Sequence, residues 1–482
     1  MSPRRPSAPD TESEPALPVT DSTAEWLRPR LTTATQEELV ALVERLASGS
    51  EDIAARINYL TNPSAAVKGL QRRIAAIRNG KRFVAYGETR QVASEIGSIA
   101  ADIRTDVLPQ DPEKAVVLAE KLFCLDQVIF ERADDSDGRI GEELREACVL
   151  WLDAAAAVRG MNADGGTGWS TMLYEFYQAN DYGIREPLLE EGRRLLREEE
   201  LRALAAGFEN DARETLDAAS AGKVERHRVF GASSAMGLVA RALRDPKLYE
   251  QSILVHSPEP NDLQANDIAQ QYLVCGDGAG ALRWLRVPVG ENARFERLDL
   301  LDRAYGLLGD RDRQIEIRRE LYRRAPGIHS YRALEAILPA DERGAFRARA
   351  CQNAKTGPHV ATAAELLFAL EEPALAEQLI IERSAELDGR NYVLLTALVK
   401  TAKANGRLLA AALIWRALLD AILARGYAKA YGHAADYLLE LRALSAVLDN
   451  YRGHPTHDSY ERALRLAHGR KASFWGRLSS AS

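Results

Sequence analysis

Turn signals recur through the second half of this chain at a nearly constant distance. They form two interleaved series with a period of roughly 30–38 residues, which is typical of stacked two-helix repeats. The segments between them are too apolar and too rich in alanine and leucine to be loops. We therefore predict five helix–turn–helix units, stacked as a right-handed α-solenoid. One series is Gly276-Asp277, Gly309-Asp310, Pro339-Ala340-Asp341, Glu371-Glu372-Pro373 and Asn405-Gly406, and the other is Pro288, Pro326-Gly327, Gly357-Pro358, Asp388-Gly389 and Gly426.

The composition favours an all-α fold. The 482 residues are 46% hydrophobic and 28% charged, as in soluble globular proteins. Strong helix formers dominate, and no alternating β-branched run is long enough to predict a sheet. No window of 18 apolar residues could span a membrane, and the N-terminus lacks the apolar core of a secretory signal. We therefore expect a cytoplasmic protein.

Charge and cysteine content exclude some classes of function. A net charge of −7 argues against a dedicated nucleic-acid binder, which usually carries a basic domain. The four cysteines are far apart in apolar helical contexts, so they indicate small buried side chains instead of disulfides or a zinc site. They are Cys124, Cys148, Cys275 and Cys351.

The chain divides into five parts by composition. Residues 1–33 are too polar to offset their ordering entropy and are expected to be disordered. A capping box at Thr35 with Glu38 starts an N-terminal helical region over 34–158, in which Asp111-Pro112 starts another helix. A glycine-rich linker is expected at 159–168. A middle helical region at 169–262 and the repeat region at 263–482 complete the chain.

Two resemblances agree with a helical fold. The unit from Tyr305 to Pro326 is similar to a degenerate tetratricopeptide repeat, with Leu-Gly-Asp at its turn. Four further segments resemble landmarks of an uncharacterised family of bacterial helical proteins, a domain of unknown function related to helical regions of SWIM-type zinc-finger proteins. That resemblance implies a fold but no activity, and the CxC…CxH zinc ligands are absent from this chain. The segments are residues 78–83, 130–138 and 180–185, and the tail with His468-Gly469-Arg470-Lys471 and Phe474-Trp475.

Motifs that suggest chemistry fail on inspection. The acidic turn from Asp134 to Gly138 has Ala133 and Leu144 where an EF-hand needs acids, so we interpret it as a cap for the next helix. His454 and His457 lie in a Pro/Gly loop without a metal-binding frame. The glycines at 165–168 lack a Walker lysine. We therefore predict no catalytic residues, no cofactor and no metal, and an enzyme is the least favoured class.

Two polar groups are candidate partner-binding residues. The stretch at 53–87 holds seven cations and no acid. On a helical wheel its apolar residues share one side, and the predicted basic face Lys68, Arg72, Arg78 and Arg82 lies opposite. This face is either solvated or docks an acidic partner. The other group, Asp181, Tyr182 and Arg185, forms either a structural corner or a ligand contact.

We hypothesise a non-catalytic interaction or scaffold protein that binds a peptide or an acidic partner on a helical-repeat surface. The alternative is a nucleic-acid-associated factor that uses the basic face at 53–87 and the basic tail at 462–477. One continuous positive stripe would favour nucleic acid, and a neutral groove with exposed aromatic side chains would favour a peptide.

Overall fold

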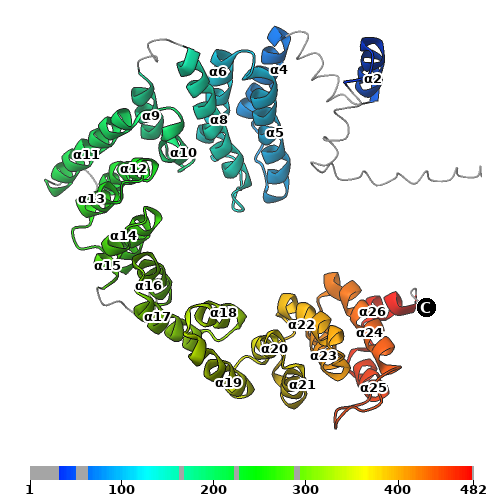
Figure 1. The fold of residues 1–482 in the computed structure, drawn as a ribbon. Helices are drawn as coiled ribbons and strands as arrows, with labels where there is room; N and C mark the ends of the chain where they lie inside the picture. The colour runs from blue at the N-terminus through cyan, green and yellow to red at the C-terminus, as the bar shows by residue number, and fades with distance from the viewer. Residues whose placement is uncertain (1–31, 50–62, 162–167, 222–226, 287–293, 480–482) are drawn as a thin grey trace, which may run out of the picture. The chain divides into compact units, whose positions relative to one another are not determined.

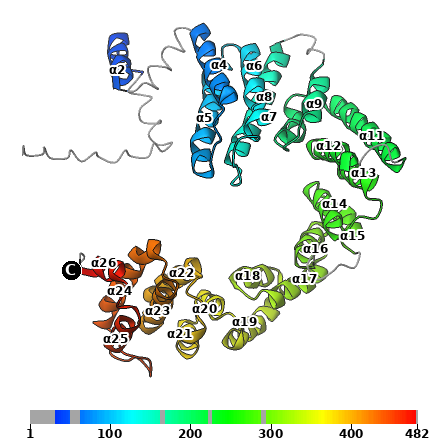
Figure 2. The same cartoon turned by 180° about the vertical axis from the view of Figure 1, so that it is seen from behind.

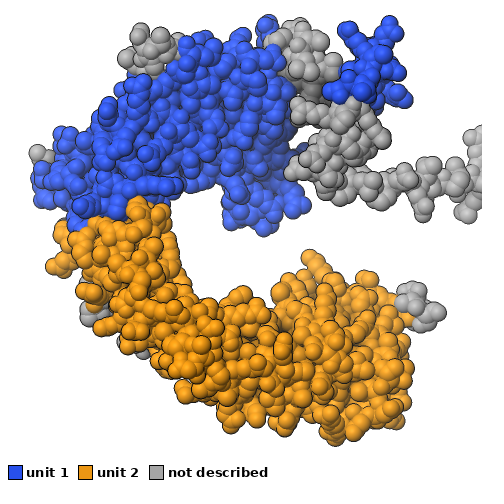
Figure 3. All heavy atoms as spheres, viewed as in Figure 1, with its two compact units in different colours: residues 1–256 blue, residues 257–482 orange. Residues whose placement is uncertain are grey.

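The computed structural model describes residues 32–49, 63–161, 168–221, 227–286 and 294–479. It divides into two compact units, residues 1–256 and 257–482 (Figure 3). Of the described residues 79% are helical, and the only extended pairing among them is an isolated parallel bridge between Val84 and Ala133. The all-α prediction is therefore confirmed. No helix in these ranges is long and apolar enough to cross a membrane.

Unit 1 is organised around its long helix α8, which packs on α5, α6 and α10. Helices α4, α5, α6 and α8 lie side by side in both views (Figures 1 and 2). The elements are α2 (Gln36–Gly49), α4 (Pro63–Asn79), η1 (Tyr86–Glu88), α5 (Thr89–Asp102), the π-helical turn η2 (Ile103–Val107), α6 (Pro112–Phe123), α7 (Asp126–Ile129), α8 (Arg139–Met161), α9 (Trp169–Gln178), α10 (Glu186–Glu190), η3 (Gly192–Arg194), α11 (Glu198–Ser220), α12 (His227–Leu243) and α13 (Pro246–His256).

The core of unit 1 is centred on Trp151 of α8. Its ring makes edge-to-face contacts with Phe123 and Phe176, at 6.5 and 5.2 Å between ring centroids. The helical spacing of the sequence predicts one apolar face made of Leu144, Cys148, Trp151 and Leu152, and all four are fully buried. Aromatic pairs of this kind stabilise a core beyond their buried area. Helix α8 continues through Arg159 to Met161, so the predicted linker begins inside a helix, and 162–167 lie outside the described residues.

Both predicted caps in unit 1 are present. The Thr35 hydroxyl accepts from the Glu38 amide at 3.3 Å, while the Glu38 carboxylate accepts from the Thr35 amide at 2.8 Å. Asp111 accepts from the amide of Lys114 at 3.1 Å, with proline at the first helical position. Each cap satisfies an amide that the helix itself leaves without a partner.

Unit 2 consists of helices that pack on their sequence neighbours: α14 on α15, α16 on α17, α20 on α21 and α22 on α23. Its elements are α14 (Asp262–Val274), α15 (Gly278–Leu285), α16 (Arg294–Leu308), α17 (Arg311–Arg324), α18 (Ile328–Ile337), α19 (Ala340–Thr356), α20 (Val360–Ala369), α21 (Pro373–Glu382), η5 (Ser384–Glu386), α22 (Tyr392–Ala404), α23 (Leu408–Arg425), η6 (Ala428–Ala430), α24 (Tyr431–Ser445), α25 (His457–His468) and α26 (Ala472–Ser479).

One tight turn, a Schellman motif, joins five of the packed helix pairs, including α12–α13 in unit 1. A residue at positive φ ends the first helix, and the next amide donates to the carbonyl five residues back. Asp277, for example, donates to Tyr272 at 2.9 Å. The positive-φ residues are Gly276, Gly309, Gly406, Glu371 at 58° and Arg244 at 54°. The equivalent bonds are Asp245 to Ala240, Asp310 to Tyr305, Glu372 to Leu367 and Arg407 to Ala402.

The predicted turn at 339–341 has a different form. Leu338 and Pro339 are both extended, and Asp341 lies in the first turn of α19. Helix α18 therefore ends without the Schellman motif, and α18 and α19 do not pack along each other. In the second predicted series, the turns at 326–327, 357–358, 388–389 and 426 separate helices as expected, whereas Pro288 lies outside the described residues.

The sequence predicts a core between the helices of unit 2 that includes Trp284, Leu307, Leu321, Leu367 and Trp415. Leu367 is fully buried, but Leu307 is 51% exposed, so the prediction is wrong for Leu307. The residue facing Leu307 is Gly278: a Cβ built there would lie 3.2 Å from the Cβ of Leu307. Because glycine has no side chain, α15 approaches α16 closely at this point without covering the leucine.

Candidate partner-binding site

Two of the family landmarks meet beside α4. The amide of Val84 donates to the carbonyl of Arg132 at 2.8 Å, and the amide of Asp134 donates to the carbonyl of Val84 at 3.0 Å. The guanidinium of Arg132 also donates to the carbonyls of Arg82, at 3.1 Å, and Ile77. These bonds tie the loop after α4 to the segment after α7, although the two are about 50 residues apart in sequence.

Gly80 makes this approach possible. A Cβ at this position would lie 3.1 Å from a terminal nitrogen of Arg132, closer than ordinary van der Waals contact. The close packing of Arg132 therefore explains why the landmark Arg78-Asn79-Gly80 ends in a glycine. Loop 80–88 leaves α4 beside the Arg132 guanidinium, and the side chains of Lys81, Arg82 and Phe83 on this loop are exposed.

The third landmark packs against the second. The rings of Phe130 and Tyr182 are 5.1 Å apart, and Arg145 of α8 donates to the carbonyl of Gly183 at 2.8 Å. Asp181 is exposed, and Tyr182 is partly exposed beside Phe130. The structure thus brings three segments that are distant in sequence to one side of unit 1.

Arg185 has a structural role. Its Nε and Nη2 donate to Asp126 at 2.8 and 2.9 Å, and the two side chains are only 2% and 1% exposed. Its remaining terminal nitrogen donates to the carbonyl of Phe176 at 3.2 Å, and its guanidinium lies 5.5 Å from the ring centre of Phe123. The alternative of a structural corner therefore fits Arg185, because each nitrogen of its buried guanidinium already donates to a protein acceptor.

Loop 80–88 forms one wall of a groove of about 860 Å³, which we call the loop-80 groove. Phe83 and Tyr86 on this loop are 59% and 56% exposed. Large aromatic side chains at this level of exposure are typical of binding surfaces when other recognition groups lie beside them. The groove is lined by residues of α4, α5 and the loop, and by Arg132: Ala76, Ile77, Gly80, Lys81, Arg82, Phe83, Val84, Gly87, Glu88, Arg90, Gln91, Val92, Ser94, Glu95 and Arg132.

The cations of the groove are only partly neutralised. Arg82 pairs with Glu88, while Glu95 pairs with Arg73 on α4 at 2.7 Å. Lys81 and Arg90 are exposed and have no ion-pair partner among the residues that the structure describes. The groove therefore presents a net positive surface next to two exposed aromatic rings.

The predicted basic face is only partly a single face. Lys68 and Arg72 are exposed on α4, opposite the buried Leu70 and Ile74, as predicted. Arg78 falls about 120° around the helix from Arg72, since successive residues turn by roughly 100°. Burial raises the pKa of the Cys124 thiol to about 11, and the positive charges of Arg185 and Arg78 oppose part of this rise.

Two acids of α5, Glu95 and Asp102, also reduce the positive charge of α4. Arg73, which sequence reasoning did not select, donates to Glu95 at 2.7 Å and to Asp102 at 2.6 Å. Arg82 at the end of the predicted face is paired with Glu88. Arg56 lies outside the described residues. The useful signal for the loop-80 groove was the landmark at 78–83, and Tyr86, Arg90 and Arg132 were missed.

The acidic turn caps α8. The carboxylate of Asp135 accepts from the amides of Ile140 and Gly141, both at 2.9 Å, and Asp137 pairs with Arg139 at 2.9 Å. The acidic turn therefore caps the helix that follows it, as we interpreted it from the sequence. Within the described ranges, no group of three or more His, Cys, Asp or Glu side chains is arranged to hold a metal ion.

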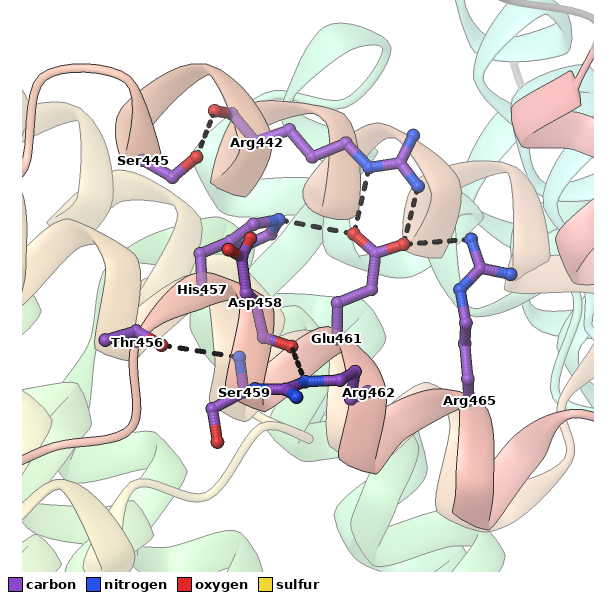
Figure 4. Close-up of polar contacts among 9 residues, drawn as sticks. All are labelled: Arg442, Ser445, Thr456, His457, Asp458, Ser459, Glu461, Arg462 and Arg465. Carbon is purple, nitrogen blue, oxygen red and sulfur yellow. Dashed lines mark hydrogen bonds and ion pairs between the residues drawn. The ribbon is translucent and has the colours of Figure 1, made fainter.

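The two histidines predicted to lie in the last loop are held in the fold of unit 2, and His457 is the first residue of α25 instead of a loop residue. His454 contacts the carbonyl of Ile381 at 3.0 Å. His457 is buried and lies 3.3 Å from Glu461, and burial lowers its pKa (Figure 4). Hydrogen bonds from Arg442, at 2.7 and 3.1 Å, lower the pKa of Glu461 to about 2, with a further bond from Arg465 at 2.9 Å. This cluster joins α24 to α25.

The fold and the groove define an all-α protein of packed helix pairs that carries a basic, aromatic surface. The chain belongs to a family of unknown function, DUF6880, whose model matches residues 32–477. The expected membership in an uncharacterised helical family is therefore confirmed, over nearly the whole chain. Comparison with curated proteins and with solved structures gives no match.

Proposed function

We propose that this protein is a non-catalytic interaction protein that holds an acidic segment of a partner protein in the loop-80 groove. The observation that carries the proposal is a groove lined by the exposed ring of Phe83 and by two exposed cations, Lys81 and Arg90, which have no ion-pair partner among the described residues. The exposed ring of Tyr86 lies on the same loop. Aromatic anchors contribute most of the energy of protein interfaces, while complementary charge raises the association rate and the specificity.

The exposed side chains of the other predicted groups extend this surface. Lys68 and Arg72 lie on α4, one or two turns before Ala76 of the groove wall, and would lengthen the region of positive potential. Tyr182 packs on Phe130, in the segment whose Arg132 and Asp134 are hydrogen-bonded to Val84 of loop 80–88. We assign Asp181 and Tyr182 to the edge of the partner's footprint and leave Arg185 out of it.

Nucleic acid is the second candidate, and charge argues against it. The groove and α4 supply only about four phosphate contacts, on a chain with a net charge of −7 that opposes approach. In the basic tail, Arg465 is already engaged, because it pairs with Glu461 and its guanidinium lies over the ring of Trp475 at 4.2 Å. We expect duplex DNA to bind no more tightly than about 10 μM at physiological salt.

We further propose that the helix pairs stack as a right-handed α-solenoid of tetratricopeptide-like units. The support is the Schellman turn that recurs at Arg244, Gly276, Gly309, Glu371 and Gly406. A solenoid would present long surfaces on which a partner segment could lie extended. The proposed relation to the helical regions of SWIM proteins would concern this architecture and no zinc chemistry.

The test is site-specific photo-crosslinking of the full chain in the native host. Phe83 is replaced by benzoylphenylalanine, and exposed Tyr392 in unit 2 receives the same replacement as a control. We expect a discrete crosslinked protein at position 83 that Lys81→Glu with Arg90→Glu abolishes. The control pair Arg193→Glu with Lys247→Glu makes the same charge change at exposed positions outside the groove and should leave the crosslink intact.

Two results would refute the proposal. One is a crosslink that both charge-reversal pairs weaken equally, because overall charge and not the groove would then be responsible. The other is sub-micromolar binding of a random duplex at about 150 mM salt, measured by fluorescence anisotropy and lost in Lys81→Glu with Arg90→Glu.

A further inference from the structure

A second cavity, of about 430 Å³, lies within unit 2 among α17, α18, α19 and α20. Pockets for small organic ligands typically measure about 300–1,000 Å³ and have mostly apolar walls. The walls here are aromatic and aliphatic, with Tyr322, Leu334, Phe346, Ala354 and Leu366 among the lining residues. We call this space the α17–α20 cavity.

The cavity lies where the repeat pattern is interrupted. Each Schellman turn of the chain joins two helices that pack along each other. Helix α18 is instead followed by extended Leu338 and Pro339, and it packs on α17 and α20 while α19 packs on α20. Helices α18 and α19 make few close backbone approaches, although Tyr331 stacks on Phe346, and the cavity lies between these helices. Departures from a repeated local rule are expected at functional sites.

The apolar wall is rigid because its rings pack on one another. Tyr322 meets Phe346 edge to face at 5.2 Å, and Phe346 stacks on Tyr331 at 4.8 Å. Tyr331 is 1% exposed, which fixes the stack from behind. A ligand ring or acyl chain entering the cavity would therefore meet a preformed surface and pay little ordering entropy.

The charged residues of the cavity are all basic. Arg319, Arg323, Arg349 and His359 line it, and no carboxylate is among its described lining residues. Arg319 pairs with Glu342, and Arg323 with Glu320 at 2.7 Å, both acids outside the lining. Arg349 is exposed and has no ion-pair partner in the described part of the chain. Its guanidinium is the group to which an anion can bind without breaking an existing pair.

We propose that the α17–α20 cavity binds an amphipathic organic anion, with its apolar body on Tyr322 and Phe346 and its acidic group at Arg349. The small side chains of Ala350 and Ala354, one and two turns after Phe346 on α19, leave room for the body beside the rings. The acidic group can be a carboxylate, a phosphate or a sulfonate, since a guanidinium can form paired hydrogen bonds with each. This site is separate from the loop-80 groove and does not depend on the function proposed for that groove.

The test uses 8-anilinonaphthalene-1-sulfonate, an aromatic sulfonate whose fluorescence rises in apolar surroundings, with the purified full chain. We expect saturable binding at one site per chain. Arg349→Glu should weaken it by about tenfold or more, as loss of a charged hydrogen-bonding partner does. Arg332→Glu is the matched control, because this exposed arginine on α18 does not line the cavity.

Two further measurements separate the cavity from general surface effects. N-phenyl-1-naphthylamine, which lacks the sulfonate, should bind wild type and Arg349→Glu equally. Ala354→Leu should exclude both probes without a loss of helical circular dichroism. Displacement of the sulfonate probe by decanoate or by decyl phosphate then shows which natural acid group is preferred. Non-saturable binding, equal effects of Arg349→Glu and Arg332→Glu, or normal binding to folded Ala354→Leu would overturn the proposal.

Discussion

The sharpest prediction concerns the buried ion pair between Asp126 and Arg185. Asp126→Asn keeps the shape of the side chain but removes its charge, and it turns one acceptor oxygen into a donor that faces the guanidinium. Both side chains are at most 2% exposed, so water cannot replace the lost partner. Removing one member of such a pair leaves an uncompensated buried charge, which costs about 3–5 kcal/mol.

The chain offers a matched control for this change. Asp153 also pairs with an arginine, Arg194, at 3.0 Å, but the two side chains are 35% and 45% exposed. Exposed pairs contribute about 0–1 kcal/mol, so Asp153→Asn should change stability by less than about 1 kcal/mol. The double variant Asp126→Leu with Arg185→Met removes both buried charges and should cost less than Asp126→Asn alone.

Hydrogen exchange measured by mass spectrometry gives a local readout. For Asp126→Asn we expect exchange in α7, α8 and α9 to become roughly 10²- to 10³-fold faster, because these helices contain or contact the pair. Peptides from α20 to α23 in unit 2 serve as an internal control and should be unchanged. The reasoning would be refuted by less than about fivefold acceleration in α7–α9, or by equal effects of Asp126→Asn and Asp153→Asn.

Three further predictions test an ion-pair cluster, a close contact and a turn. Glu461 has a pKa of about 2 in the fold against an ordinary 4.5, so its contribution to stability is present above about pH 4.5 and is lost as the pH falls toward 2. Glu461→Gln should therefore flatten this part of the profile of melting temperature against pH. Parallel profiles for the variant and the wild type would contradict the prediction. Gly389→Ala should destabilise by about 1–3 kcal/mol in urea unfolding, because its Cβ would lie 2.1 Å from the backbone of α23, whereas Gly344→Ala, with nothing within 4 Å, should not. Glu371→Gly should raise the unfolding free energy by about 1 kcal/mol by relieving a positive φ, while Glu372→Gly at negative φ should not; equal effects would argue against backbone strain.

Local features of the fold could be predicted from the sequence. The caps at Thr35 and Asp111 depend on residues three positions apart, and the turns at Gly276, Gly309 and Gly406 depend on a glycine that accepts positive φ. The order of helices follows from such signals and from apolar periodicity. The turn at 338–339 was located, but its extended form and the cavity beside it were not anticipated.

The candidate site was harder to predict because its charges are set by residues distant in sequence. Asp126 is 59 residues from Arg185, so the buried pair could not be inferred from either segment alone. The stretch at 53–87 contains no acid, yet Glu95 and Asp102 reach Arg73 from the next helix. The landmark at 78–83 contributes residues to the loop-80 groove, while the distribution of free charge within the groove required the fold.

The recurrent Schellman turn has a consequence for the order of folding. The whole motif lies within about seven residues, and its last member often caps the next helix, as Asp277 does by accepting from the amide of Gly280 at 2.7 Å. Its formation therefore needs no contact with any other pair. Contacts of such short sequence separation form early and at low entropic cost. Each pair joined in this way can consequently assemble as soon as its second helix leaves the ribosome, before the next pair has been synthesised.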